Sequence, residues 1–209
     1  MQPLSNDSIN FGWFLAYKFF NSLFLGLSIG AVFTLYEPLS PAIFSAGGIG
    51  LALATLAVAT QYHRLFRPYW FFRLSMCVEL IILMGILAVL IYPLDEPIAL
   101  FVYLGYQLTF ALGNYLVRCE TLLFVDNRRL AQLDVAKQIA YLVGMGSSWI
   151  GYQILAEKFE ITNKVTQVTA LHWPLLGIEV IIIICLTYAF GRRGRQGSGS
   201  AHAGTSHLD

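Results

Sequence analysis

Charge is scarce in this chain of 209 residues. Lys, Arg, Asp and Glu make up only 12% of the positions, whereas soluble domains carry roughly 25%. Hydrophobic residues make up 57%, and the mean hydropathy is +0.65. A soluble fold this apolar would expose large aggregating patches, whereas a bilayer accepts such patches as lipid-facing surface. The composition therefore predicts an integral membrane protein.

Further absences exclude several classes of function. Cys77, Cys119 and Cys185 stand alone in apolar stretches, which argues against a disulfide framework and against a metal knuckle. No basic tract with interleaved aromatic residues occurs, so we expect no binding to nucleic acid. No Gly-x-Ser-x-Gly, His-Glu-x-x-His or phosphate-binding glycine loop is present. We therefore expect no metal, no cofactor and no enzymatic activity. An intramembrane enzyme is the least favoured of the three functions that we consider for this sequence. The polar start at Met1–Asn10 predicts no cleavable signal.

Long apolar segments fill most of the chain instead. A helical crossing of the bilayer needs about 20 apolar residues, and six segments meet this need, each closed by charge or proline. Barrel strands alternate apolar and polar residues, which the run Val180–Ile184 does not. We therefore predict an all-α polytopic membrane protein with six transmembrane helices, at about 11–36, 41–62, 69–92, 98–119, 130–155 and 171–190.

Basic residues predict the orientation of these spans. With the N-terminus inside, the inner segments hold eight arginines, namely Arg64, Arg67, Arg73, Arg128, Arg129, Arg192, Arg193 and Arg195. The outer loops then hold only Lys158 and Lys164. This bias predicts two cytoplasmic termini. We further expect the membrane to be the inner membrane of a bacterium. We expect residues 191–209 to be a disordered cytoplasmic tail, and the part from Gly197 onward resembles a linker or a cloning remnant.

Polar groups inside the spans are candidates for function, since an ionisable group at a span centre costs about 2.5–3.5 kcal/mol on insertion scales. Lys18 and Asn21 lie in the first span, Glu79 in the third and Glu179 in the sixth. The two acids are candidate sites of proton coupling. They could instead be neutral acids that hydrogen-bond in helix packing, and Lys18 could extend toward the inner headgroups.

The fourth span carries an ordered polar stripe. Gln107, Asn114 and Arg118 follow one another at intervals of seven and four residues, which places them on one helical face. Lipid does not favour such a face, so we expect it to meet protein or water. Arg118 lies near the predicted cytoplasmic boundary, where it could pair with Glu120 or with Asp134 and clamp the helix ends. Lys137 could do the same.

Two motifs resemble those of the major facilitator superfamily of transporters. In that family the second span ends in Gly-x-x-x-Asp-Arg-x-Gly-Arg-Arg, and Ala59, His63, Arg64 and Arg67 stand here at matching offsets. Phe66 replaces the second glycine. The family pattern Arg-x-x-x-Gly-x-Gly of span four compares with Gln107, Ala111 and Gly113. The acid Glu120, the basic turn Arg128–Arg129 and Gly144 with Gly146 further resemble the family's passage from span four to span five, where it has a longer charged inner loop.

The resemblance covers residues 11–190 and implies one half of such a transporter. A single half cannot close a substrate cavity, so a homodimer is implied, or a heterodimer with another six-helix chain. In the family, spans one and four line the cavity. The implied substrate is a small anionic or zwitterionic solute that moves by alternating access, bound by residues on those spans: Lys18, Asn21, Gln107, Asn114 and Arg118. A gating or structural charge network would comprise Arg64, Arg67, Glu120, Arg129, Asp134 and Lys137. The alternative is a non-transporting membrane subunit or scaffold whose polar faces dock a partner protein.

Overall fold

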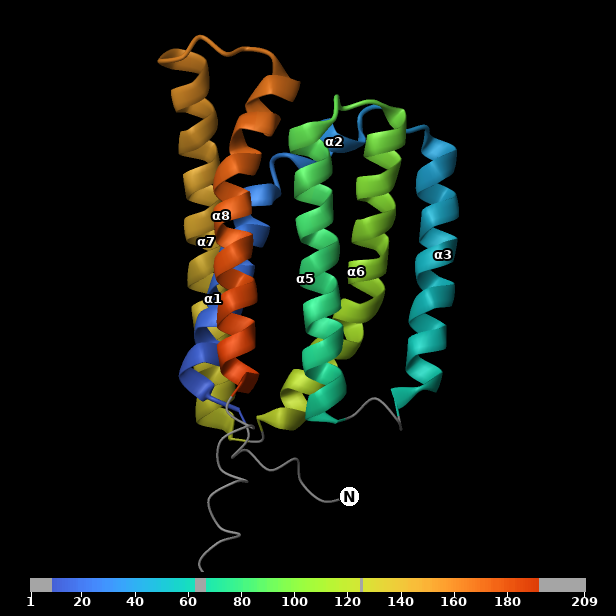
Figure 1. Cartoon of the computed structure of the whole chain (residues 1–209), viewed down its shortest axis with the longest axis vertical. Helices are drawn as coiled ribbons and strands as arrows, with labels where there is room; N and C mark the ends of the chain where they lie inside the picture. The colour runs from blue at the N-terminus through green and yellow to red at the C-terminus, as the bar shows by residue number, and fades with distance from the viewer. Residues whose placement is uncertain (1–8, 63–66, 125, 192–209) are drawn as a thin grey trace, which may run out of the picture.

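The computed structural model describes residues 9–62, 67–124 and 126–191, which form helices and contain no strand. The all-α prediction is thereby confirmed. The helices are α1 (Phe11–Ser28), α2 (Val32–Tyr36), α3 (Pro41–Thr60), α5 (Pro68–Ile91), α6 (Glu96–Leu123), α7 (Asn127–Glu157) and α8 (Lys164–Phe190). The long helices run up and down in one bundle (Figure 1). The start of α1 and the end of α8 meet at the same end, where Asn10 N donates to Ala189 O at 3.0 Å. We call this the terminal end.

Four of the described helices, α3, α5, α6 and α8, are long and apolar enough to cross a membrane. This agrees with a protein embedded in a membrane. Helix α1 has 18 residues and includes Lys18 and Asn21, and α7 includes four charged residues in its first eleven positions, at 128, 129, 134 and 137. Crossing by α1 and α7 is part of the function proposed below.

The helix starts follow from local sequence. Asn10 caps α1, and its side-chain oxygen accepts from Gly12 N at 3.1 Å. Asp95, Asp126 and Asn163 cap α6, α7 and α8 in the same way. Each cap satisfies backbone N–H groups that have no partner within the helix. Proline opens α3 and α5, where its fixed φ suits the first turn.

The segment 11–36, expected as one span, is divided between α1 and α2. The helix stops at Ser28, and Ile29, Gly30 and Ala31 form a turn. Ser28 Oγ donates to Leu25 O at 3.1 Å, a back-bond that often bends helices. Glycine at position 30 also has low helix propensity. The chain therefore redirects near the end of α1.

The junction of α6 and α7 corrects a second expectation. A longer charged inner loop was expected between the fourth and fifth spans, but α6 continues to Leu123 and α7 begins at Asn127. Glu120, Asp134 and Lys137 therefore lie on helices and have defined directions. The resemblance predicted too long a loop, because a charged stretch at a span boundary can continue the helix as readily as end it.

Close backbone contact joins α1 to α7. A Cβ atom on Gly26 would collide with the carbonyl oxygen of Tyr141, and one on Gly144 would collide with that of Leu23. Two facing glycines let the helix backbones approach more closely than larger residues allow. On its other side α1 packs against α8, so α1 lies between α7 and α8.

The remaining helices extend the bundle to one side. Helix α5 packs on α8, α6 packs on α5, and α3 lies outermost against α6 (Figure 1). No side chain of α3 is buried. Its main anchor is Tyr103 of α6, which donates to Phe44 O at 3.3 Å and whose ring occupies the space where Gly47 has no side chain.

Candidate functional site

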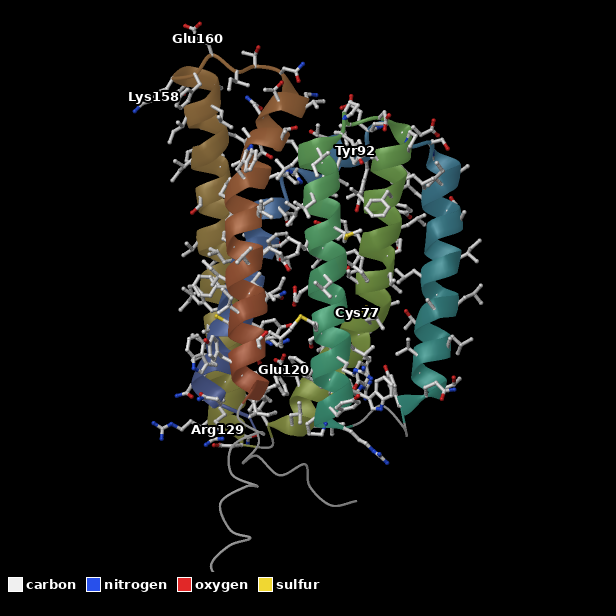
Figure 2. The ribbon with its side chains drawn as sticks, viewed as in Figure 1. Cys77, Tyr92, Glu120, Arg129, Lys158 and Glu160 are labelled. Carbon is white, nitrogen blue, oxygen red and sulfur yellow. The ribbon has the colours of Figure 1, made fainter. Side chains whose placement is uncertain are left out.

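A buried acid on α6, Glu120, binds two lysines. It lies near the terminal end of the bundle (Figure 2). Glu120 Oε2 lies 2.7 Å from Lys18 Nζ of α1, and Glu120 Oε1 accepts from Lys137 Nζ of α7 at 2.8 Å. Lys137 Nζ also lies 2.8 Å from Asp134 Oδ1. The Glu120 side chain is 4% exposed, whereas that of Asp134 is 61% exposed. This cluster joins three helices and reaches from the core to the surface.

Aromatic rings enclose the ammonium group of Lys18. It lies 5.2 Å from the ring centre of Tyr17, 5.7 Å from that of Phe14 and 5.8 Å from that of Phe71. Such rings attract a cation through their faces. Phe14 also packs on Phe124 and Phe190, with ring centres 4.9 and 6.3 Å apart. These aromatic side chains close the bundle toward its terminal end.

A second buried acid, Glu79 of α5, faces α1. Tyr17 donates its hydroxyl to Glu79 Oε1 at 2.8 Å, and Asn21 Nδ2 donates to the same oxygen at 3.3 Å. Tyr17 and Asn21 are four residues apart and so lie on one face of α1. The position immediately after Tyr17 is Lys18, the partner of Glu120. Consecutive residues of α1 thus contact the two acids.

Glu179 of α8 completes the site. It is fully buried, and its carboxyl group lies close enough to that of Glu79 to interact with it electrostatically. Both oxygens of Glu179, and Glu79 Oε2, make no hydrogen bond of standard geometry with any described residue. Ser75 Oγ, one turn before Glu79, is also buried without a partner in this part of the chain. We call Glu79 and Glu179 the carboxyl pair.

Both members of the carboxyl pair lie at one depth. Glu79 is eleven residues from the first residue of α5, and Glu179 is eleven from the last residue of α8. At about 1.5 Å per residue, each lies about 16 Å from the terminal end of its helix. The hydrocarbon core of a bilayer is about 30 Å thick. The carboxyl pair would therefore lie near the middle of a membrane that these helices cross.

The polar stripe of α6 is only partly internal. Gln107 is half-buried, and its Oε1 lacks a partner among the described residues. Asn114 and Arg118 are exposed on the surface of the single chain. Arg118 makes no ion pair with a described residue, so the expected clamp to Glu120, Asp134 or Glu79 is absent from this part of the chain.

The five residues predicted to bind one substrate are not brought together within one chain. Lys18 and Asn21 contact buried acids, whereas Asn114 and Arg118 face outward. Arg118 and Glu120 are two residues apart, which turns their side chains about 200° from each other around the helix axis. Because Glu120 points at Lys18, Arg118 points away from it. A solute between Lys18 and Arg118 of one copy is thereby excluded in this structure.

The predicted charge network is present in part. Glu120, Asp134 and Lys137 form the cluster described above. Arg129 lies 3.9 Å from Asp126 and its guanidinium lies 5.2 Å from the ring centre of Phe11. Arg67 is exposed at the start of α5. Arg64 lies outside the described residues, as do the tail arginines at 192, 193 and 195.

Sequence reasoning missed Tyr17 and Ser75. Tyrosine is common in apolar segments, so Tyr17 carried no signal of its own. Its spacing of four from Asn21 was the one usable clue, because it puts two donors on the same helical face. The described residues contain no group of three side chains arranged to hold a metal ion.

Comparison with known proteins identified no relative of this chain. No family model, no curated protein and no solved structure matches this chain.

Proposed function

We propose that this chain is one half of a proton-coupled secondary transporter, in which two copies carry a small anionic or zwitterionic solute by alternating access. One observation carries the proposal. A carboxyl pair without full hydrogen bonding is buried in mid-bundle, and a line of ionisable groups leads toward it from the surface. Ionisable side chains buried among apolar helices often belong to proton or substrate pathways.

The order of contacts supports a proton route. Asp134 is the exposed end, followed by Lys137, Glu120 and Lys18, with successive contacts of 2.8, 2.8 and 2.7 Å. From Lys18 the neighbouring Tyr17 reaches Glu79 at 2.8 Å. A carboxyl group in a dry site without a cation takes up a proton rather than hold an unpaired charge. Glu79 and Glu179 are accordingly the proposed proton carriers.

The topology of the proposal uses six crossings, by α1 with α2 and by α3, α5, α6, α7 and α8, as in half of a major facilitator transporter. Both termini are placed in the cytoplasm of a bacterium. Of the six, four helices have the required length and apolarity. Helix α7, with 31 residues, is about 46 Å long and so exceeds the hydrocarbon core even with its charged first turns outside it.

In this proposal, the exposed part of the α6 polar stripe faces a second copy of the chain. Asn114 lies nine residues from the last residue of α6, about 14 Å from the terminal end. At that depth an amide is poorly accommodated by lipid. Arg118 and Asn114 would instead line a cavity between two copies, and Arg118 would supply the cation for the solute. Gln107, further along the same helix, would contribute its unpartnered oxygen.

Solute-driven proton movement in vesicles tests the proposal. The protein is reconstituted with an internal pH dye, and a panel of carboxylates and amino acids is added outside. At least one solute should move protons, and Glu79→Gln and Glu179→Gln should each abolish that movement. Glu157→Gln, which changes an exposed acid at the end of α7, should leave it intact. Proton movement that persists when both Glu79 and Glu179 are replaced would overturn their proposed role in coupling.

A scaffold role is the second candidate, and the outermost helix favours it. No side chain of α3 is buried, so the side of α3 that faces away from α6 is free to meet another protein. Native mass measurement in nanodiscs separates the candidates. A transporter of two halves should have the mass of two chains, and Arg118→Gln should weaken the pairing. A lone chain of 23.3 kDa, silent toward the whole solute panel, would favour the scaffold.

A further inference from the structure

An elongated groove of about 700 Å³ opens between α5 and α6. One wall is a stripe of exposed α5 residues, and the other is a stripe of exposed α6 residues. The α5 stripe is Arg73, Cys77, Leu80 and Met84, and the α6 stripe is Phe101, Leu104 and Leu108. Helices α1, α2 and α8 form the floor, through Phe24, Leu35 and Leu175. The groove extends along α5 as far as Ile86.

The groove is suited to a hydrocarbon chain rather than to a polar solute. Two polar groups that line it already have partners in their own helices: His172 Nδ1 lies 2.7 Å from Val168 O, and Thr109 Oγ1 donates to Tyr106 O at 2.9 Å. These two atoms therefore require no ligand. From Arg73 to Ile86 the groove follows thirteen residues, about 20 Å of helix, whereas one leaflet of hydrocarbon is about 15 Å thick.

One positive charge lies at one end of the groove. Arg73 is on the second turn of α5, close to the terminal end, and its guanidinium lies 5.0 Å from the ring centre of Tyr69. It makes no ion pair with a described residue. A guanidinium presents a planar set of donors that matches the oxygens of a phosphate. The groove thus combines an apolar channel at least as long as one leaflet is thick with an anion-binding end.

We propose that this groove binds one anionic phospholipid from the leaflet at the terminal end, with the phosphate at Arg73 and an acyl chain between the two stripes. The proposal is independent of transport, since it uses none of the carboxyl pair, the lysines or the α6 polar stripe. Basic sites between helices commonly bind anionic lipid headgroups.

Native mass spectrometry of the full chain tests the charge requirement. Phosphatidylglycerol and phosphatidylcholine with identical acyl chains are added separately to the detergent-solubilised protein. We expect phosphatidylglycerol to bind about fivefold more tightly, the factor that one arginine near a membrane surface contributes. Arg73→Gln should abolish this preference. Arg67→Gln, which removes an exposed arginine that does not line the groove, should retain it. Equal binding of both lipids by the wild-type chain would overturn the proposal.

Filling the groove tests the place of binding. A Cβ on Gly85, within the groove, meets no atom within 4 Å, so Gly85→Phe can occupy the groove without a clash at its first atom. A Cβ on Gly177 of α8 is equally unobstructed but lies outside the groove, which makes Gly177→Phe the matched control. Gly85→Phe should reduce phosphatidylglycerol binding by more than fivefold and Gly177→Phe should not. Undiminished binding in Gly85→Phe would place the lipid elsewhere.

The native thiol of Cys77 gives a second readout in the unaltered chain. Cys77 of α5 (labelled in Figure 2) lines the groove and is exposed, whereas Cys119 and Cys185 are buried. Phosphatidylglycerol should slow the reaction of Cys77 with a maleimide several-fold, and Gly85→Phe should remove that protection. Protection that depends on protein concentration but not on lipid would instead assign the groove to a second copy of the chain, and would overturn the lipid proposal.

Discussion

Two buried acids in this bundle have opposite surroundings. Glu120 is bound by the ammonium groups of Lys18 and Lys137, at 2.7 and 2.8 Å. Glu179 has no cation beside it, and neither of its oxygens makes a hydrogen bond of standard geometry with a described residue. Charges persist in an apolar interior only when they are paired and hydrogen-bonded. We therefore expect loss of Glu120 to destabilise the fold and loss of Glu179 to leave its stability largely unchanged.

The largest effect is expected from Glu120→Gln. The substitution leaves the buried ammonium of Lys18 without a counter-charge, and breaking such a pair typically costs about 3–5 kcal/mol of unfolding free energy. Thermal unfolding in detergent should show a melting temperature many degrees below that of the wild type. Combining Glu120→Gln with Lys18→Met should recover much of the loss, because Lys137 keeps Asp134 as a partner. Equal melting temperatures of Glu120→Gln and the wild type would show that Glu120 does not stabilise the fold.

Tyr17→Phe should have an intermediate effect. It removes the hydroxyl that donates to Glu79 Oε1 at 2.8 Å and leaves only the longer bond from Asn21. A buried acceptor that loses its donor costs about 1–3 kcal/mol. Chemical unfolding measures the change. The matched control is Tyr188→Phe, on the exposed side of α8, which should change little. A loss as large as that of Glu120→Gln would mean that the carboxyl pair is as structural as the lysine cluster.

Glu179→Met should leave stability unchanged or raise it by up to about 1 kcal/mol, because an apolar side chain of similar size replaces a buried carboxyl whose oxygens make no hydrogen bond of standard geometry with a described residue. The same variant should lose solute-driven proton movement completely. A variant that is stable but inactive would show that Glu179 serves function and, unlike Glu120, does not stabilise the fold. If Glu179→Met melts well below the wild type, the acid contributes to packing after all, and the contrast with Glu120 fails.

The smallest effect is expected from Asp134→Asn. The Asp134 side chain is 61% exposed, and ion pairs at such sites contribute at most about 1 kcal/mol. Melting should therefore change little, and less still in high salt, which screens exposed charges. Proton movement should slow without stopping, because Asp134 is only the entrance of the proposed route. Complete loss of movement would make this exposed acid a carrier in its own right.

The sequence predicted the helical class and singled out the ionisable residues inside the apolar segments, because a charge in such a segment is conspicuous from the sequence alone. The sequence did not show which of these residues contact one another. Lys18 and Glu120 are 102 positions apart, and their contact depends on the way α1 lies between α7 and α8. Arg118 was grouped with Lys18 because both lie on expected cavity helices. Only the rotation of α6 about its axis, fixed by packing on α5, decides that Glu120 faces inward and Arg118 outward.

The same limit applies to helix ends. The turn at residues 29–31 depends on small residues within an otherwise apolar stretch, so hydropathy alone reads α1 and α2 as one segment. The charged residues that follow the fourth span were expected to open a loop because they interrupt the apolar run. In the structure α6 continues to Leu123, and Glu120 pairs with Lys18 of α1 and Lys137 of α7. Hydropathy reports the cost of a residue in lipid, and it does not report whether tertiary contacts offset that cost.

The exposed position of α3 has a consequence for how the protein is made. Segments that are apolar on every side enter a membrane one by one, by partition between water and lipid, before they associate. Because no side chain of α3 is buried, its insertion needs no other part of the bundle. Docking comes later, through the packing of α3 on α6, which includes the Tyr103 ring in the gap at Gly47. During biogenesis α3 can thus remain in the bilayer as a separate helix until α6 has been synthesised and the two helices pack together.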